Sequence, residues 1–89
     1  MISSVESINN VNTLVFNNQE MTVLFEDGRR LSVPLWWYPR LARAEPKQRE
    51  HWEFCAGKRG IHWPEIDEDL SIQGILEGRK APDAVQTLQ

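Results

Sequence analysis

The sequence contains a single cysteine, Cys55, so no disulfide can form within the chain. This is typical of proteins from a reducing compartment. No apolar run approaches the roughly 20 residues that a membrane-spanning helix requires. Residues 1–10 also lack the basic segment and following apolar segment of a secretory signal peptide. We therefore expect a cytoplasmic protein that does not associate with membranes.

Residues that bind metals or phosphates are also few. The five glycines are too scattered to make a glycine-rich phosphate loop. A transition-metal site usually needs two or more His or Cys ligands at defined spacing, but His51 and His62 lie on different predicted elements. The acidic run from Glu65 to Asp69 lacks the central glycine of a calcium-binding loop. We therefore predict neither a metal site nor a cofactor.

Catalytic residues are equally hard to identify. Cys55 with His51 or His62 would give a nucleophile and a base, yet the sequence shows no third group that would orient the base. Carboxylates as close in sequence as those of the acidic run are usually solvated. We predict that the protein is not an enzyme and has no catalytic residue. An enzyme that uses His62 and the acidic run is the alternative left open.

The charge of the chain is unevenly distributed. Its 89 residues suit one small domain, and its apolar share of 40% and charged share of 26% are ordinary for a globular chain. Behind the net charge of −3, residues 29–59 carry eight basic and three acidic side chains, whereas residues 1–28 and 60–89 are acidic. A basic middle can attract nucleic acid or an acidic partner, or the acidic flanks can neutralise it.

Three strands are predicted in the first half of the chain. Residues 13–16, 21–25 and 29–34 are rich in β-branched and apolar side chains, and the last of them alternates apolar with polar residues. Turn-forming residues at 17–19 and 26–28 separate them. Strands joined by such short turns form an antiparallel meander.

A helical linker is predicted after the meander. Pro34 should end the third strand, and Pro39 and Pro46 each suit the first turn of a short helix. Arg49 lies four residues from acids on either side, which favours ion pairs along the second helix.

A second hairpin and a last helix are predicted in the remainder. From Trp52 onward, the side chains are expected to alternate between two faces with a period of two, as in a strand. The return strand around His62 should direct Ile61 and Trp63 inward. The stretch "GIHWPEID" is therefore interpreted as a sheet edge that leads into a helix cap. Ser71 is a good N-cap for the last helix, which Gly78 should end.

The sequence thus predicts a small α+β domain over residues 1–78, followed by a disordered tail over residues 79–89. Its architecture is an antiparallel β-meander and a second hairpin, with a helical linker and a short C-terminal helix. The predicted core is Val23, Phe25, Leu31, Val33, Ile61, Trp63, Ile75 and Leu76.

Three segments together resemble a known family. "VLFEDGRRLSVPL", "WYPRL" and "GIHWPEIDEDLS" occur here in the order and spacing of the bacterial domain-of-unknown-function family numbered 2442. The resemblance covers about residues 14–78 and implies a small α+β protein with no established activity. Some members are encoded beside another small protein and are suggested to be the antitoxin half of such pairs. The resemblance therefore implies another small protein, encoded nearby, as the partner.

The segment "PLWWYPRL" carries the predicted binding surface. A helix or strand cannot bury three consecutive aromatic residues on one face, so at least one should be partly exposed. Exposed Trp and Tyr beside Arg are typical of interface hot spots. The predicted partner-binding residues are Trp36, Trp37, Tyr38, Arg40 and Arg43.

Three hypotheses about the binding partner stay open. The alternative to a protein partner is a nucleic-acid-binding or regulatory protein that uses the same basic and aromatic segment, although the pI of about 5.3 disfavours it. The free edges of a small sheet also allow a homodimer.

Overall fold

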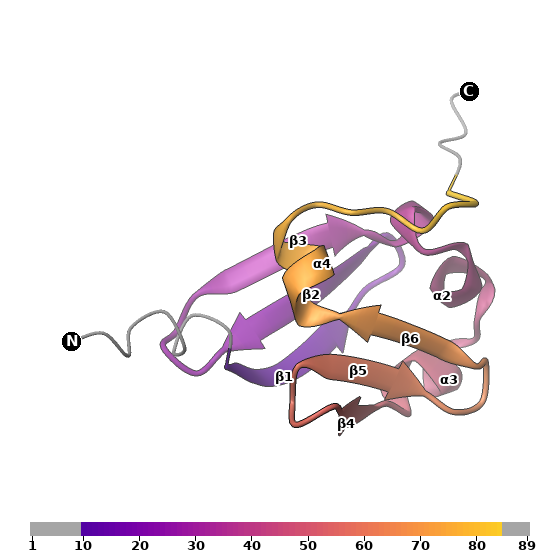
Figure 1. Cartoon of the computed structure of the whole chain (residues 1–89). Coiled ribbons are helices and arrows are strands. Elements are labelled where there is room, and N and C mark those ends of the chain that lie inside the picture. Colours follow the sequence, from indigo (N-terminus) through magenta and orange to yellow (C-terminus); the bar gives the residue numbers. More distant parts are fainter. Residues whose placement is uncertain (1–9, 85–89) are drawn as a thin grey trace.

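A computed structural model describes residues 10–84 of the chain, which fold into two three-stranded antiparallel sheets and several short helices (Figure 1). The predicted α+β class is confirmed. In chain order the elements are β1 Val11–Phe16, β2 Glu20–Phe25, β3 Arg30–Pro34, the 3-10 turn η1 Leu35–Trp37, α2 Pro39–Arg43, α3 Pro46–Glu50, β4 Glu53–Cys55, β5 Gly60–Trp63, β6 Glu68–Ser71 and α4 Ile72–Leu76.

The first sheet is the predicted meander, in the order β1–β2–β3. Its two turns are stabilised as their residue types predict. The side-chain oxygen of Asn17 accepts hydrogen bonds from the backbone N–H groups of Gln19 and Glu20, each at 2.7 Å. Gly28 adopts φ +97° in the second turn, a conformation that favours glycine.

The helical linker joins the two sheets. Pro39 and Pro46 each occupy the first turn of a helix, as predicted. At the start of α3, the side chains of Glu45 and Gln48 form a reciprocal capping box. The predicted ion pairs of Arg49 are wrong, because this side chain is buried and turns back to α2.

The second sheet contains one more strand than the predicted hairpin. β4 and β5 pair as expected, but residues 68–71 form a third strand, β6, beside β5. The sequence predicts only an acidic loop before the cap at Ser71. Ser71 does cap α4, because its hydroxyl oxygen accepts a hydrogen bond from the Gly74 N–H at 2.8 Å.

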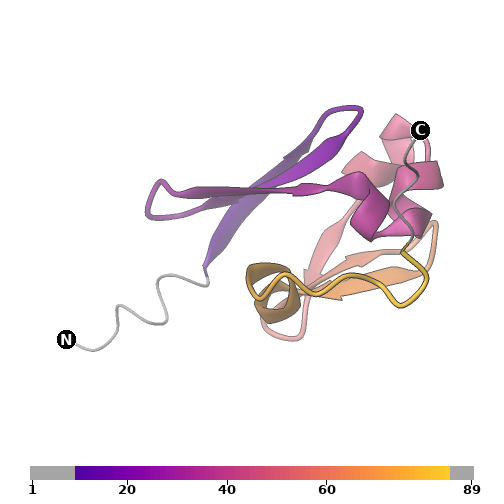
Figure 2. The same ribbon diagram turned by 90° about the horizontal axis from the view of Figure 1, so that it is seen from above.

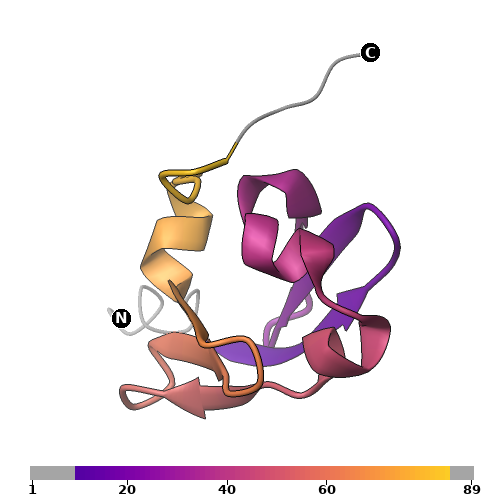
Figure 3. The ribbon, with the colours of Figure 1, turned by 90° about the vertical axis from the view of Figure 1, so that its right-hand side faces the viewer.

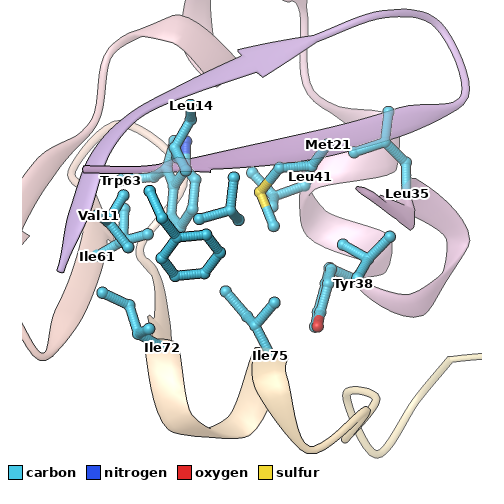
Figure 4. Close-up of a cluster of buried hydrophobic side chains, with 13 residues drawn as sticks. Val11, Leu14, Met21, Leu35, Tyr38, Leu41, Ile61, Trp63, Ile72 and Ile75 are labelled. Carbon is cyan, nitrogen blue, oxygen red and sulfur yellow. The ribbon is translucent and has the colours of Figure 1, made fainter. Parts of the chain in front are cut away.

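The two sheets form separate layers with the helical linker at one end (Figure 2). α2 and α4 both lie over the same side of the second sheet (Figure 3). The core between these elements is continuous, and Trp63 and Ile61 of β5 are fully buried in it (Figure 4). Of the predicted core, Leu31 and Leu76 are only partly buried and pack against the edge of the cluster.

The chain after α4 continues along the body of the fold. Gly78 ends the helix with φ +78°, and the Arg79 N–H donates to the Gly74 carbonyl. The Ala81 N–H then donates to the carbonyl of Trp37 at 2.9 Å. Residues 85–89 of the predicted tail and residues 1–9 of the predicted domain lie outside the described residues. Among residues 10–84 no helix has the length and apolar character needed to cross a membrane.

Candidate functional site

The aromatic residues of the predicted surface lie on one tight turn. The η1 turn brings Trp36 and Trp37 edge to face, with ring centroids 6.4 Å apart and planes at 83°. Trp37 meets Tyr38 in the same way at 6.3 Å. Both tryptophans are partly buried, and Trp37 packs against the core cluster. Trp36 is therefore the ring that stands farthest from the core.

A lysine from the C-terminal segment completes this aromatic cluster. The Lys80 Nζ lies 5.1 Å from the ring centroid of Trp37 and 5.9 Å from that of Trp36, within the range of cation–π attraction. The adjacent hydrogen bond from Ala81 to Trp37 holds this segment against the turn. Trp36, Trp37 and Lys80 are called the Trp–Lys cluster below.

A surface groove of about 450 Å³ borders Trp36. Its apolar wall is formed by Pro34, Leu35, Trp36 and Ala42. Its polar wall is formed by Asn18 and Gln19 of the β1–β2 turn and by Glu20 at the start of β2. Backbone bonds fix the two walls relative to each other, because the Leu35 N–H donates to the Gln19 carbonyl at 2.8 Å. The groove thus combines a flat apolar side with amide and carboxylate groups, which suits an extended peptide or a protruding side chain.

Tyr38 does not belong to the exposed surface. Its side chain is 2% exposed, and its hydroxyl donates to the carbonyl of Arg79 at 3.3 Å. Burial raises the pKa of Tyr38 to about 12, and the charge of Glu68 adds to the effect. Tyr38 therefore offers no exposed ring to the predicted partner-binding surface, since the 3-10 turn before it directs this ring into the core.

The two predicted arginines lie in different surroundings. The Arg40 guanidinium donates to the backbone carbonyl of Asp67 at 2.6 Å and lies beside the partly buried Glu68. Burial raises the pKa of Glu68, while Arg40 acts in the opposite direction. Arg43 is exposed at the end of α2. Arg40 and Ala42 are two residues apart and point to different sides of the helix, so Arg40 does not join the groove.

Arg49, another residue of the basic segment, is buried in the fold. Arg49 is 9% exposed, and its guanidinium donates to the carbonyls of Leu41 at 2.9 Å and Ala42 at 3.2 Å. These carbonyls end α2, where a cation is favoured. The side chain is therefore occupied by a structural role and is not available to bind phosphates.

A second polar constellation lies on the outer face of the second sheet. Glu53, His62 and Asp69 face one another across β4, β5 and β6. Hydrogen-bonded pairs alternate along an antiparallel ladder, and Arg59 and Ile72 form one such pair. His62 and Asp69 therefore form a non-hydrogen-bonded pair, in which side chains approach most closely. His62 Nδ1 lies 2.5 Å from Asp69 Oδ1.

The carboxylates around His62 explain why the pKa of its imidazole is raised. The hydrogen bond to Asp69 raises the pKa of His62, desolvation opposes it, and the charges of Asp69, Glu53 and Asp67 add to the rise. Asp69, the last residue of the acidic run, is thus the side chain that orients the His62 imidazole. Among the described residues, no three His, Cys, Asp or Glu side chains gather closely enough to hold a metal ion.

Cys55 has a packing role on the same sheet. A β-carbon placed on Gly60 would lie 2.9 Å from the Cys55 Sγ and 3.4 Å from the Leu70 carbonyl oxygen. The thiol therefore covers the bare backbone of its cross-strand partner, Gly60.

The sequence predicts that the tryptophans form a surface but does not predict what surrounds them. It places Lys80 in a disordered tail and indicates no role for the β1–β2 turn beside Trp36. Neither residue type nor spacing in a sequence shows which distant segment packs against a turn, so these neighbours of Trp36 and Trp37 could not be predicted.

Comparisons with known proteins agree on the fold. A family model described as "Protein of unknown function (DUF2442)" matches residues 11–81. A protein of unknown function from Rhodospirillum rubrum, solved by crystallography, aligns with a TM-score of 0.70 and 23% identity over 84% of this chain and 93% of its own. An uncharacterised Chromobacterium violaceum protein, solved by NMR, aligns with a TM-score of 0.69 and 17% identity, covering 92% and 84% of the two chains. No curated protein matches this sequence.

Proposed function

The chain belongs to the DUF2442 family of proteins of unknown function, and we propose that it is a cytoplasmic, non-catalytic module that binds another protein. The observation that carries this proposal is the position of Trp36. Its ring forms part of the apolar wall of a groove, beside Lys80 and opposite a polar turn that leads into Glu20. Partly exposed tryptophans in such settings often dominate the binding energy of an interface.

The site has both parts that a binding surface needs. The ring of Trp36 and the rigid side chain of Pro34 offer apolar area that loses little conformational freedom on binding. Lys80 and Glu20 lie at its margins and offer charges of opposite sign, which would orient a partner. The redefined surface is therefore Trp36, Trp37 and Lys80 with the groove beside them, while Arg43 remains a candidate contact on α2.

The absence of catalysis is part of the proposal. A nucleophile must lie within hydrogen-bond reach of its base, and no such contact joins Cys55 to His62 or His51 among the described residues. Both histidines are instead paired with carboxylates, His51 with Glu65 at 2.6 Å and His62 with Asp69. These contacts support a structural role for the imidazoles.

The proposed partner is a small protein encoded by the adjacent gene. The chain would bind and neutralise that protein as an antitoxin does. The support for this narrower proposal is the family resemblance alone. The purified product of the adjacent gene is therefore the ligand to test, by calorimetric titration against the purified chain.

A matched pair of tryptophan variants tests the surface. Trp36→Ala should weaken binding by about 30-fold or more, as expected for loss of a hot-spot residue. Trp52→Ala removes another partly buried tryptophan, which packs on Phe54 at 5.2 Å, away from η1. It should leave the affinity nearly unchanged. Equal losses in both variants, at equal stability, would contradict the proposal.

Nucleic-acid binding is the competing outcome. Arg49 is buried and Arg40 is held beside acidic residues, so the basic segment presents less free charge than its sequence suggests. Titration with single-stranded DNA and RNA at two salt concentrations distinguishes the two functions. Binding that weakens steeply with salt, without binding to the protein partner, would replace the proposed function.

A further inference from the structure

The outer face of the first sheet is an ordered array of three rows. Alternation along the strands and the register across them place the same three rows on β1, β2 and β3. The first row is Thr13, Leu24 and Arg30, the central row is Val15, Thr22 and Ser32, and the last row is Glu20 and Pro34. The inner positions of these strands fill the core instead.

This face is open and partly apolar. Val15 is 49% exposed and is the one large hydrophobic side chain with high exposure among the described residues. Thr13, Thr22 and Leu24 around it are partly buried by their neighbours in the sheet. No described helix lies on the outer side of this sheet (Figure 2). A sheet face with this composition is suited to packing against a second sheet.

The charges on the face are arranged to complement a second copy. Arg30 lies in the first row and Glu20 in the last, on either side of the central row. A two-fold axis that runs along the central row exchanges the first and last rows between copies. Arg30 of one copy then faces the last row of the other copy. Within that row it lies one strand away from Glu20, a sideways distance of roughly 4.8 Å.

The alternative axis is disfavoured by the same charges. A two-fold axis parallel to the strands and centred on β2 would leave each row facing itself. Glu20 would then face Glu20 of the second copy, which repels. The central-row axis also places Val15 against its own copy, so the most exposed apolar side chain is covered.

We propose that the outer face of β1–β2–β3 binds the same face of a second copy of this chain, around a two-fold axis along the central row at Val15. The face is about three strands wide and five residues long, roughly 14 Å by 17 Å. Such a footprint buries less area than a standard stable interface. The dimer is therefore weak and forms as the protein concentration rises.

Charge reversal tests the proposed pairing by sedimentation equilibrium at concentrations up to about 1 mM. Glu20→Arg and Arg30→Glu should each raise the dimer dissociation constant about tenfold or more, because each creates a like-charge contact. The double variant should restore the affinity of the native chain. A chain that stays monomeric throughout, or single reversals without effect, would overturn the proposal.

Cross-linking tests the position of the axis. In a Cys55→Ser background, Val15→Cys should give a covalent dimer with a rigid bifunctional maleimide that spans the roughly 10 Å between packed sheets. Thr13→Cys is the matched control on the same strand, because the axis separates its two copies by two further rows. Efficient linkage at Thr13 but not at Val15 would show a different interface, such as pairing of sheet edges. Trp36→Ala should not change self-association, so this result is separate from that of the proposed function.

Discussion

The indole N–H of Trp63 donates a hydrogen bond to the backbone carbonyl of Arg49, with 2.8 Å between the nitrogen and the oxygen. Trp63 is fully buried in β5, and Arg49 lies in α3. The guanidinium of the same arginine caps the end of α2 through Leu41 and Ala42. Arg49 thus connects two helices of the linker with the second sheet, using both its backbone and its side chain.

Replacing Arg49 should therefore destabilise the fold. Arg49→Met keeps much of the buried aliphatic length but leaves the Leu41 and Ala42 carbonyls without their charged donor. We expect the free energy of unfolding to fall by about 1–3 kcal/mol, the range for leaving a buried hydrogen-bonding group without its partner. Urea denaturation followed by tryptophan fluorescence measures this change. The exposed Arg43→Met should change it by less than about 0.5 kcal/mol.

Gly60 should not tolerate a side chain. The β-carbon of Gly60→Ala would lie 2.9 Å from the Cys55 Sγ, so we expect a loss of roughly 1–3 kcal/mol in the free energy of unfolding. The Cys55→Ala background removes that sulfur and should reduce the loss. A double-mutant cycle measured by urea denaturation gives the coupling between the two positions. If the cost of Gly60→Ala is the same in both backgrounds, the thiol is not what excludes the methyl group.

The stability of the protein should depend on the ionisation of His62. The contact with Asp69 raises the pKa of His62 in the folded state above its ordinary value of 6.5. The contribution is therefore fully present below pH 6.5 and is lost as the pH rises through the folded-state pKa. The stability difference between the native chain and Asp69→Asn should be larger at pH 6 than at pH 9.

An NMR titration of the imidazole supplies the direct measurement. The native His62 resonance should titrate above 6.5, and Asp69→Asn should lower that midpoint because its amide carries no charge. A smaller decrease is expected for Glu53→Gln, since the charge of Glu53 is a lesser contribution to the shift. An unchanged midpoint in Asp69→Asn would show that the short contact with His62 is not formed in solution.

The first sheet could be predicted from local signals alone. Alternation in residues 29–34 and the turn at Gly28 depend only on neighbouring residues, and the structure confirms both. The positions of Pro39 and Pro46 at helix starts follow from the missing N–H of proline and are equally local. The inward direction of Ile61 and Trp63 follows from the period of a strand.

The missed features depend on distant partners. β6 contains Glu68 and Asp69, which are poor strand formers, and it becomes a strand because β5 offers a ladder to pair with. Tyr38 is buried because its ring turns toward the core, where its hydroxyl meets the carbonyl of Arg79, 41 residues away. Lys80 joins the tryptophans through a hydrogen bond between two backbone groups 44 residues apart, at Ala81 and Trp37. Residue types in the sequence carry no signal for such pairings.

The contact between Arg40 and the Asp67 carbonyl has a consequence for solubility. Asp67 directly precedes β6, whose far side has no neighbouring strand in the described sheet. An added strand there would have to displace a charged guanidinium from the backbone oxygen it holds. Charged groups at strand edges discourage pairing with further strands, so we expect the guanidinium held beside the start of β6 to disfavour edge-to-edge association of this sheet.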